Sequence, residues 1–153
     1  MTDPTPSRPS VRLKPKADAR RIRHGHPWVF DTDLVTDRRT RALEPGSLAV
    51  LEDAGRDPVA LVAVNPTSRI MARVLDADPD AQLDANWFAA RLSAALAIRE
   101  KLFDAPFYRL IHAEADGLPG VVIDRFGDVV VIQPNAAWAE THINALASAV
   151  AQV

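Results

Sequence analysis

The sequence predicts an α+β protein in which a small β-barrel is followed by a partial α+β domain. Short apolar runs separated by turn residues fill the first half of the 153 residues, a spacing typical of small barrels and sandwiches. A helical repeat of apolar residues then begins near residue 85. Two β-rich runs separated by a turn follow it, between residues 121 and 132, and indicate a hairpin.

Composition narrows the class of protein. Hydrophobic residues make up 48% of the chain and charged residues 25%, so we expect one ordinary soluble domain or two small ones. The sequence has no run of eighteen apolar residues and no secretory signal, which predicts a cytoplasmic protein with no membrane partner. It has no cysteine, and this excludes disulfides, thiolate metal sites and a cysteine nucleophile within the chain.

Charge is distributed unevenly along the chain, although the net charge is only −2. Residues 8–41 hold ten lysines and arginines against four aspartates, whereas residues 42–153 hold eight basic and fifteen acidic residues. A basic front on an acidic body is expected of a module that contacts phosphate. A solvated polar face is the other interpretation that charge alone allows.

The first domain is predicted over residues 11–76, after a disordered tail at residues 1–10 that carries three prolines. Turn residues, mostly proline and glycine, separate its predicted elements. These elements are a strand at 11–14, a helix at 16–23 capped by Gly25, a strand at 26–30, a loop at 31–40, and strands at 47–53, 59–64 and 69–75.

The second domain is predicted over residues 84–153. Asp84 caps a helix over residues 85–103, a strand follows at 108–113, and the hairpin comes next. A last helix begins near residue 139 and stops in mid-pattern, so we expect the chain to be the front part of a longer protein. One side of this helix is apolar and consists of Ile143, Leu146, Ala147 and Val150.

No catalytic arrangement is predicted. The six glycines form neither a GxGxxG motif nor a Walker loop. Glu114 and Asp116 could act as paired acid/base carboxylates, but an aspartate before a glycine more often caps a turn. No metal site is predicted either, because no carboxylate pattern accompanies the four histidines, which are His24, His26, His112 and His142.

The basic stretch contains the candidate binding site, because cations beside a glycine-bearing bend suit a phosphate backbone. Trp28 follows the bend and either stacks on a base or packs in the barrel core. Arg125, in the hairpin turn, is expected to be solvated instead. The candidate residues are Lys14, Lys16, Arg20, Arg21, Arg23, His24, Gly25, His26, Trp28, Arg69 and Arg73.

Three stretches of the sequence resemble one family. They are RIRHGHPWVF at residues 21–30, SRIMARVL at 68–75 and YRLIHAEADGLPGVVIDRFGD at 108–128. Together they resemble the N-terminal half of the RlmI-like large-subunit ribosomal RNA methyltransferases, which are class I enzymes that use S-adenosylmethionine to make 5-methylcytosine. The resemblance covers nearly the whole chain, from residue 11 to residue 153.

The resemblance implies a PUA domain, a small RNA-binding β-barrel, at residues 11–76 and the start of a central domain from residue 84. The methyltransferase domain, with its cofactor loops and catalytic cysteine, would lie outside this chain. The chain is therefore expected to bind ribosomal RNA through residues 16–28, and to hold no S-adenosylmethionine and no catalytic residue. The turn Asp116-Gly117-Leu118-Pro119-Gly120 (the DGLPG turn) is expected to serve packing rather than RNA contact.

Two other functions stay open at this point. A stand-alone PUA-type RNA-binding or adaptor protein, with no catalytic activity, would carry the same features. Alternatively, the acidic second domain is an interaction platform, and the apolar side of the last helix is the surface of a homodimer.

Overall fold

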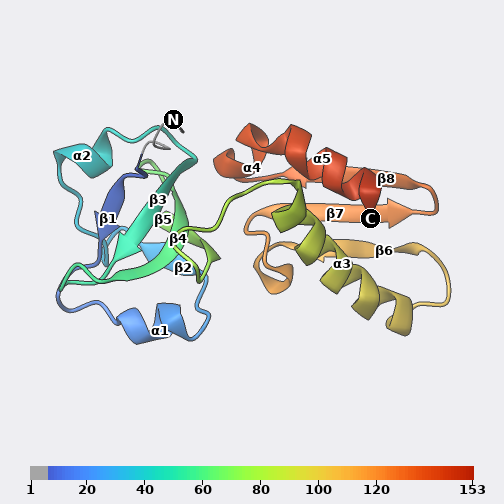
Figure 1. Ribbon diagram of the computed structural model, residues 1–153, viewed down its shortest axis with the longest axis horizontal. Coiled ribbons are helices and arrows are strands. Elements are labelled where there is room, and N and C mark those ends of the chain that lie inside the picture. The colour runs from blue at the N-terminus through green and yellow to red at the C-terminus, as the bar shows by residue number, and fades with distance from the viewer. Residues whose placement is uncertain (1–6) are drawn as a thin grey trace, which may run out of the picture. The chain divides into compact units, whose positions relative to one another are not determined.

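The computed structural model describes residues 7–153 and divides the chain into two compact units (Figure 1). The first unit ends at Ala81, and the second is Gln82–Val153. Of the tail predicted at residues 1–10, residues 1–6 lie outside the described part of the chain. Ser10 already belongs to the first strand, so that part of the tail prediction is wrong.

The first unit is built on one five-stranded sheet. Its strands are β1 (Ser10–Arg12), β2 (Trp28–Phe30), β3 (Ser47–Glu52), β4 (Pro58–Val64) and β5 (Ile70–Asp76). They lie in the order β1-β3-β4-β5-β2, with β1 parallel to β3 and the other pairs antiparallel. Every strand predicted in this part of the sequence is therefore present, although the exact bounds shift by a residue or two.

The two edges of this sheet meet and close it into a barrel. Leu13, just after β1, forms an antiparallel bridge with Leu34, which follows β2. The Lys14 amide donates to the Asp33 carbonyl across the same junction at 2.8 Å. Leu13 and Leu34 are buried in a core of aliphatic side chains from all five strands. The small β-barrel predicted from the spacing of the turns is confirmed.

Two short helices attach to this barrel. The first, α1 (Ala19–Arg23), begins later than predicted, and Gly25 ends it with φ +98°, as predicted. The prediction of a loop over residues 31–40 is wrong at its C-terminal end, because a second helix, α2 (Arg38–Arg41), begins there. The carboxylate of Asp37 accepts the Thr40 amide at 2.9 Å and so caps this helix.

The second unit packs helices on a three-stranded antiparallel sheet (Figure 1). Its strands, in spatial order, are β6 (Phe107–His112), β7 (Val121–Phe126) and β8 (Val129–Pro134). The helix α3 (Ala85–Leu102) begins as predicted, because the Asp84 carboxylate accepts the Trp87 amide at 2.9 Å.

The last predicted helix is in fact two helices, α4 (Ala137–Thr141) and α5 (Ile143–Gln152), which meet at His142. The His142 imidazole Nδ1 donates to the Trp138 carbonyl at 2.7 Å, and such a local bond competes with continuation of the helix. The α5 helix packs against α3 and buries Leu146 completely. Part of the apolar side predicted as a dimer surface is therefore used inside the unit.

Asp116 opens the DGLPG turn and carries a structural ion pair. The guanidinium of Arg99, on α3, donates to both of its carboxylate oxygens at 2.7 and 3.0 Å. The same carboxylate accepts the His112 amide at 2.7 Å. Only 15% of the Arg99 side chain and 8% of the Asp116 side chain are exposed. Asp116 therefore ties the turn to α3, as the capping interpretation predicts, and is not free for acid/base chemistry with Glu114.

The rest of the DGLPG turn is held by two further side chains. Arg91, also on α3, donates from Nε to the Gly117 carbonyl at 3.1 Å. Trp138 of α4 donates from its indole nitrogen to the Pro119 carbonyl at 2.9 Å, and both the indole and Leu118 are buried. The turn thus joins α3 to α4 within this unit, which agrees with the packing role expected from the sequence.

The prediction that Arg125 is a solvated residue of the hairpin turn is wrong. It belongs to β7 and is half-buried, because its Nη1 donates to the Tyr108 hydroxyl at 3.0 Å. Its Nε donates to the Gly127 carbonyl at 2.9 Å. The hairpin turn itself consists of Gly127 and Asp128.

Candidate nucleic-acid interface

The α1 helix presents three arginines to solvent. Asp18 caps the helix by accepting the Arg20 amide at 2.9 Å. Ile22 is the one residue of the five-residue helix that is buried, and it anchors the helix to the barrel. Arg20, Arg21 and Arg23 are therefore turned outward and are exposed. This arrangement gives a compact cationic surface on a fixed support.

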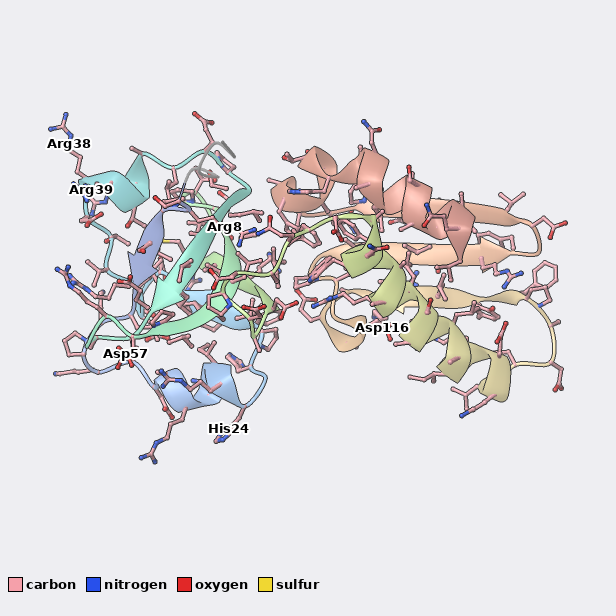
Figure 2. The ribbon with its side chains drawn as sticks, in the orientation of Figure 1. Arg8, His24, Arg38, Arg39, Asp57 and Asp116 are labelled. Carbon is pink, nitrogen blue, oxygen red and sulfur yellow. The ribbon has the colours of Figure 1, made fainter. Side chains whose placement is uncertain are left out.

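The bend after α1 continues this surface. Gly25 adopts φ +98°, and no atom beyond its two chain neighbours lies within 4 Å of the position that a Cβ would occupy. The bend therefore faces open space, and its backbone is accessible to a ligand. His24 is exposed beside it, and Figure 2 shows this side chain at the end of α1, directed away from the barrel.

A shallow hollow lies between the bend and the barrel. Its lining includes Arg21, His26, Trp28 and Asp18. Arg21 Nη2 donates to His26 Nε2 at 2.8 Å, so each side chain fixes the orientation of the other. Trp28 is half-buried and borders the hollow, outside the fully buried core. Part of its side chain is therefore accessible at the surface, while the rest packs on the barrel.

Arg23 differs from the other two arginines because an acid already compensates it. Its Nη2 lies 3.2 Å from a carboxylate oxygen of Asp53, in the turn after β3. The pKa of Asp53 is lowered mainly by the hydrogen bond from the Asp57 amide, and the Arg23 guanidinium lowers it further. Arg23 is thus the weakest of the three as a partner for phosphate.

Sheet pairing brings Arg73 to the same region, whereas Arg69 lies farther along β5. Arg73 is the strand neighbour of Trp28 across the β2–β5 pair. Arg69 precedes β5, beyond the Phe30–Ile70 pair, and is exposed. The remaining candidates, Lys14 and Lys16, are exposed in the segment that links β1 to α1.

One cationic group was missed as a candidate. Arg38, Arg39 and Arg41 are exposed on α2, a segment that the sequence predicted to be loop. A local signal could have identified this helix. Asp37 is a capping residue, and it lies three positions before Thr40, whose amide it accepts.

Other kinds of site find no support in the part of the chain that the structure describes. No group of three or more histidines and carboxylates within residues 7–153 could hold a metal ion. Within the same residues, no helix combines the length and the apolar character needed to span a membrane.

Comparison with known proteins places this barrel in a family of domains. A family model described as a PUA-like domain matches residues 11–77, which cover the barrel and its two short helices. A ribosomal RNA large subunit methyltransferase from Deinococcus radiodurans is 41% identical over 147 residues, which are 90% of this chain and 36% of the relative. Ribosomal RNA large subunit methyltransferase I from Alteromonas mediterranea is 38% identical over 135 residues, 86% of this chain and 33% of the relative.

This chain is related to the PUA-like N-terminal part of the ribosomal RNA large subunit methyltransferases. It spans about a third of the length of these curated relatives. The resemblance stated from the HPWVF and DGLPG stretches is thus confirmed.

The fold of this chain is also found among solved structures. A chain from Streptococcus mutans described as "a putative sam-dependent methyltransferase" superposes with a TM-score of 0.78. The match covers 95% of this chain and 38% of that chain at 15% sequence identity. At this identity the comparison shows a shared fold, and it extends over both units of the present chain.

Proposed function

We propose that this chain is the RNA-docking part of a ribosomal RNA methyltransferase, and that the surface formed by α1 and its bend binds the RNA backbone. The observation that carries this proposal is the position of three outward arginines and an open glycine bend on a PUA-like barrel. Guanidinium groups donate bidentate hydrogen bonds to phosphate oxygens, and a bend without side chain bulk lets the RNA backbone approach.

The proposed surface has a centre and a periphery. At the centre, Arg20 and Arg21 carry charge that no carboxylate within salt-bridge distance neutralises in the described chain. At the side, the half-buried Trp28 offers an aromatic side chain against which a base can pack. The periphery consists of Lys14, Lys16, Arg23, His24, His26, Arg69 and Arg73.

The reaction itself is assigned to the whole enzyme. We propose a cytosine C5 methyl transfer with S-adenosylmethionine as the methyl donor, because the chain is related to methyltransferases of ribosomal RNA. None of the residues described above is given a catalytic or cofactor-binding role in this proposal. A cytoplasmic location, where ribosomal RNA is available, belongs to the same proposal.

Changing Arg20 and Arg21 to Ala tests the RNA-binding surface. We expect the affinity for ribosomal RNA fragments to fall roughly tenfold at low salt, to a similar extent for different sequences, because phosphate contacts do not read sequence. The measurement is fluorescence anisotropy with labelled fragments. Changing Lys101, an exposed residue of α3, to Ala is the control and should leave binding unchanged. Equal affinity of the double variant and the wild type would remove the surface from the proposal.

A homodimer is a separate prediction from the sequence. Because Leu146 is buried against the rest of its own unit, a dimer would have to use other side chains of α5 or another surface. Light scattering over a dilution series measures this directly. A mass that falls from twice the chain mass to the chain mass of 16.7 kDa on dilution is expected for a weak dimer, and a constant monomer mass would exclude it.

A further inference from the structure

A second cationic surface lies on α2, away from the proposed RNA-binding bend. Figure 1 shows α1 and α2 at opposite ends of the barrel. In Figure 2 the side chains of Arg38 and Arg39 extend away from the ribbon at one end, and His24 lies at the other. The two cationic surfaces are therefore separate, and one phosphate group cannot contact both.

The α2 helix is constructed so that its arginines face solvent. Successive residues of a helix are rotated by about 100°, so Arg38, Arg39 and Arg41 cover an outward arc of about 160°. Thr40, the third residue of the helix, points in the opposite direction and is buried, with 4% of its surface exposed. The Asp37 cap and the buried Thr40 thus fix the helix and leave the three guanidinium groups free to meet a ligand.

In the described part of the chain, no carboxylate lies within salt-bridge distance of these three guanidinium groups. Asp37 is the nearest acid in sequence, but its carboxylate is engaged by the amide and hydroxyl of Thr40, which lower its pKa more than Arg39 does. Three like charges on a single turn repel one another, and a polyanion relieves that repulsion.

Two other arginines of this unit have structural partners. Arg8 donates to the carbonyls of Pro79 and Ala81 at 3.1 and 2.7 Å, and Arg23 pairs with Asp53. Among the described residues, the side chains of the three α2 arginines form no such structural bond.

We propose that Arg38, Arg39 and Arg41 form a second phosphate-binding point for the same RNA, which crosses the barrel from the α1 bend to α2. This inference rests on the proposed function, since it takes ribosomal RNA as the ligand. It adds a requirement on the ligand: an RNA must be extended or folded widely enough to reach both ends of the barrel. Short oligonucleotides engage one surface at a time and bind more weakly.

The test compares four forms of the full chain with a long ribosomal RNA fragment, over a series of salt concentrations. They are the wild type, R20A/R21A, R38A/R39A/R41A and R38K/R39K/R41K. Each lost phosphate contact reduces the slope of log affinity against log salt by about 0.7–0.9. We expect R38A/R39A/R41A to lower the slope by about 2 and the affinity at low salt by tenfold or more. R38K/R39K/R41K keeps the charge and should retain most of the binding. Circular dichroism checks that all three variants stay folded.

The possible results separate this inference from the proposed function. If the wild type binds, R20A/R21A weakens binding and R38A/R39A/R41A leaves the slope unchanged, the second binding point is wrong and the proposed function stands. If the wild type does not bind the RNA at low salt, the proposed function fails and the inference fails with it. If R38A/R39A/R41A lowers the slope and R20A/R21A does not, α2 is the main RNA-binding point. That result would overturn the inference that α2 is a second point beside the α1 bend.

Discussion

Replacing Asp116 with Ala should destabilise the second unit by about 3 kcal/mol, the largest loss that we expect from a single charged side chain. The change removes both bonds from Arg99 and leaves that guanidinium, which is 15% exposed, without its acid. It also removes the acceptor of the His112 amide. The measurement is urea unfolding followed by fluorescence, because Trp87 and Trp138 both lie in this unit.

Two variants control this prediction. D116N keeps an oxygen that can accept the His112 amide but removes the charge, so its loss should be smaller than that of D116A. D124A breaks an ion pair of similar geometry, in which Arg109 Nε lies 2.8 Å from Asp124 Oδ1. The Arg109 side chain is 46% exposed. Solvent screens that pair, so D124A should cost much less. Equal losses for D116A and D124A would show that the DGLPG turn does not depend on its buried ion pair.

Replacing Gly120 with Ala should also destabilise the second unit by about 3 kcal/mol. Gly120 adopts φ +74°, where a residue with a Cβ is strained by about 1–2 kcal/mol. A Cβ there would stand only 2.7 Å from the Cβ of Ala136, at the start of α4, and such overpacking adds a similar cost. Urea unfolding of the full chain measures the sum.

The two causes can be separated with matched variants. G127A places a Cβ at a similar positive φ of +67°, but its nearest atom is 3.8 Å away, on Phe107, so only the strain remains. The double variant G120A/A136G removes the close contact and keeps the strain. We expect both to lose about half as much as G120A. A double variant as unstable as G120A would show that contact with Ala136 is not the reason for a glycine at this position.

Much of the fold could be predicted from local patterns. Alternating apolar residues between turns gave all five strands of the barrel, and Asp84 marked the start of α3 through its capping bond. The errors occur where a side chain acts on the backbone. A capping carboxylate at Asp37 nucleates α2, and the imidazole of His142 interrupts the last helix. These bonds depend on a single side chain, and hydrophobic periodicity does not detect them.

The candidate site was less predictable than the fold. The cluster of basic residues around Gly25 was visible in the sequence. Charge alone could not separate Arg20, which pairs with no carboxylate in the described chain, from Arg23, which pairs with Asp53. That pairing joins residues 30 positions apart. Likewise, Arg125 looked solvated because its partner, Tyr108, comes from another strand. Long-range contacts decide which charges are available, and they require the fold.

Binding of this chain to ribosomal RNA fragments, at a low and a physiological salt concentration, tests the central claim most directly. Fluorescence anisotropy with a labelled fragment gives both affinities. The proposed function predicts clear binding at low salt and a loss of about a thousandfold at higher salt, as expected for several phosphate contacts. No binding at low salt, or binding that does not respond to salt, would contradict the assignment of RNA docking to these residues.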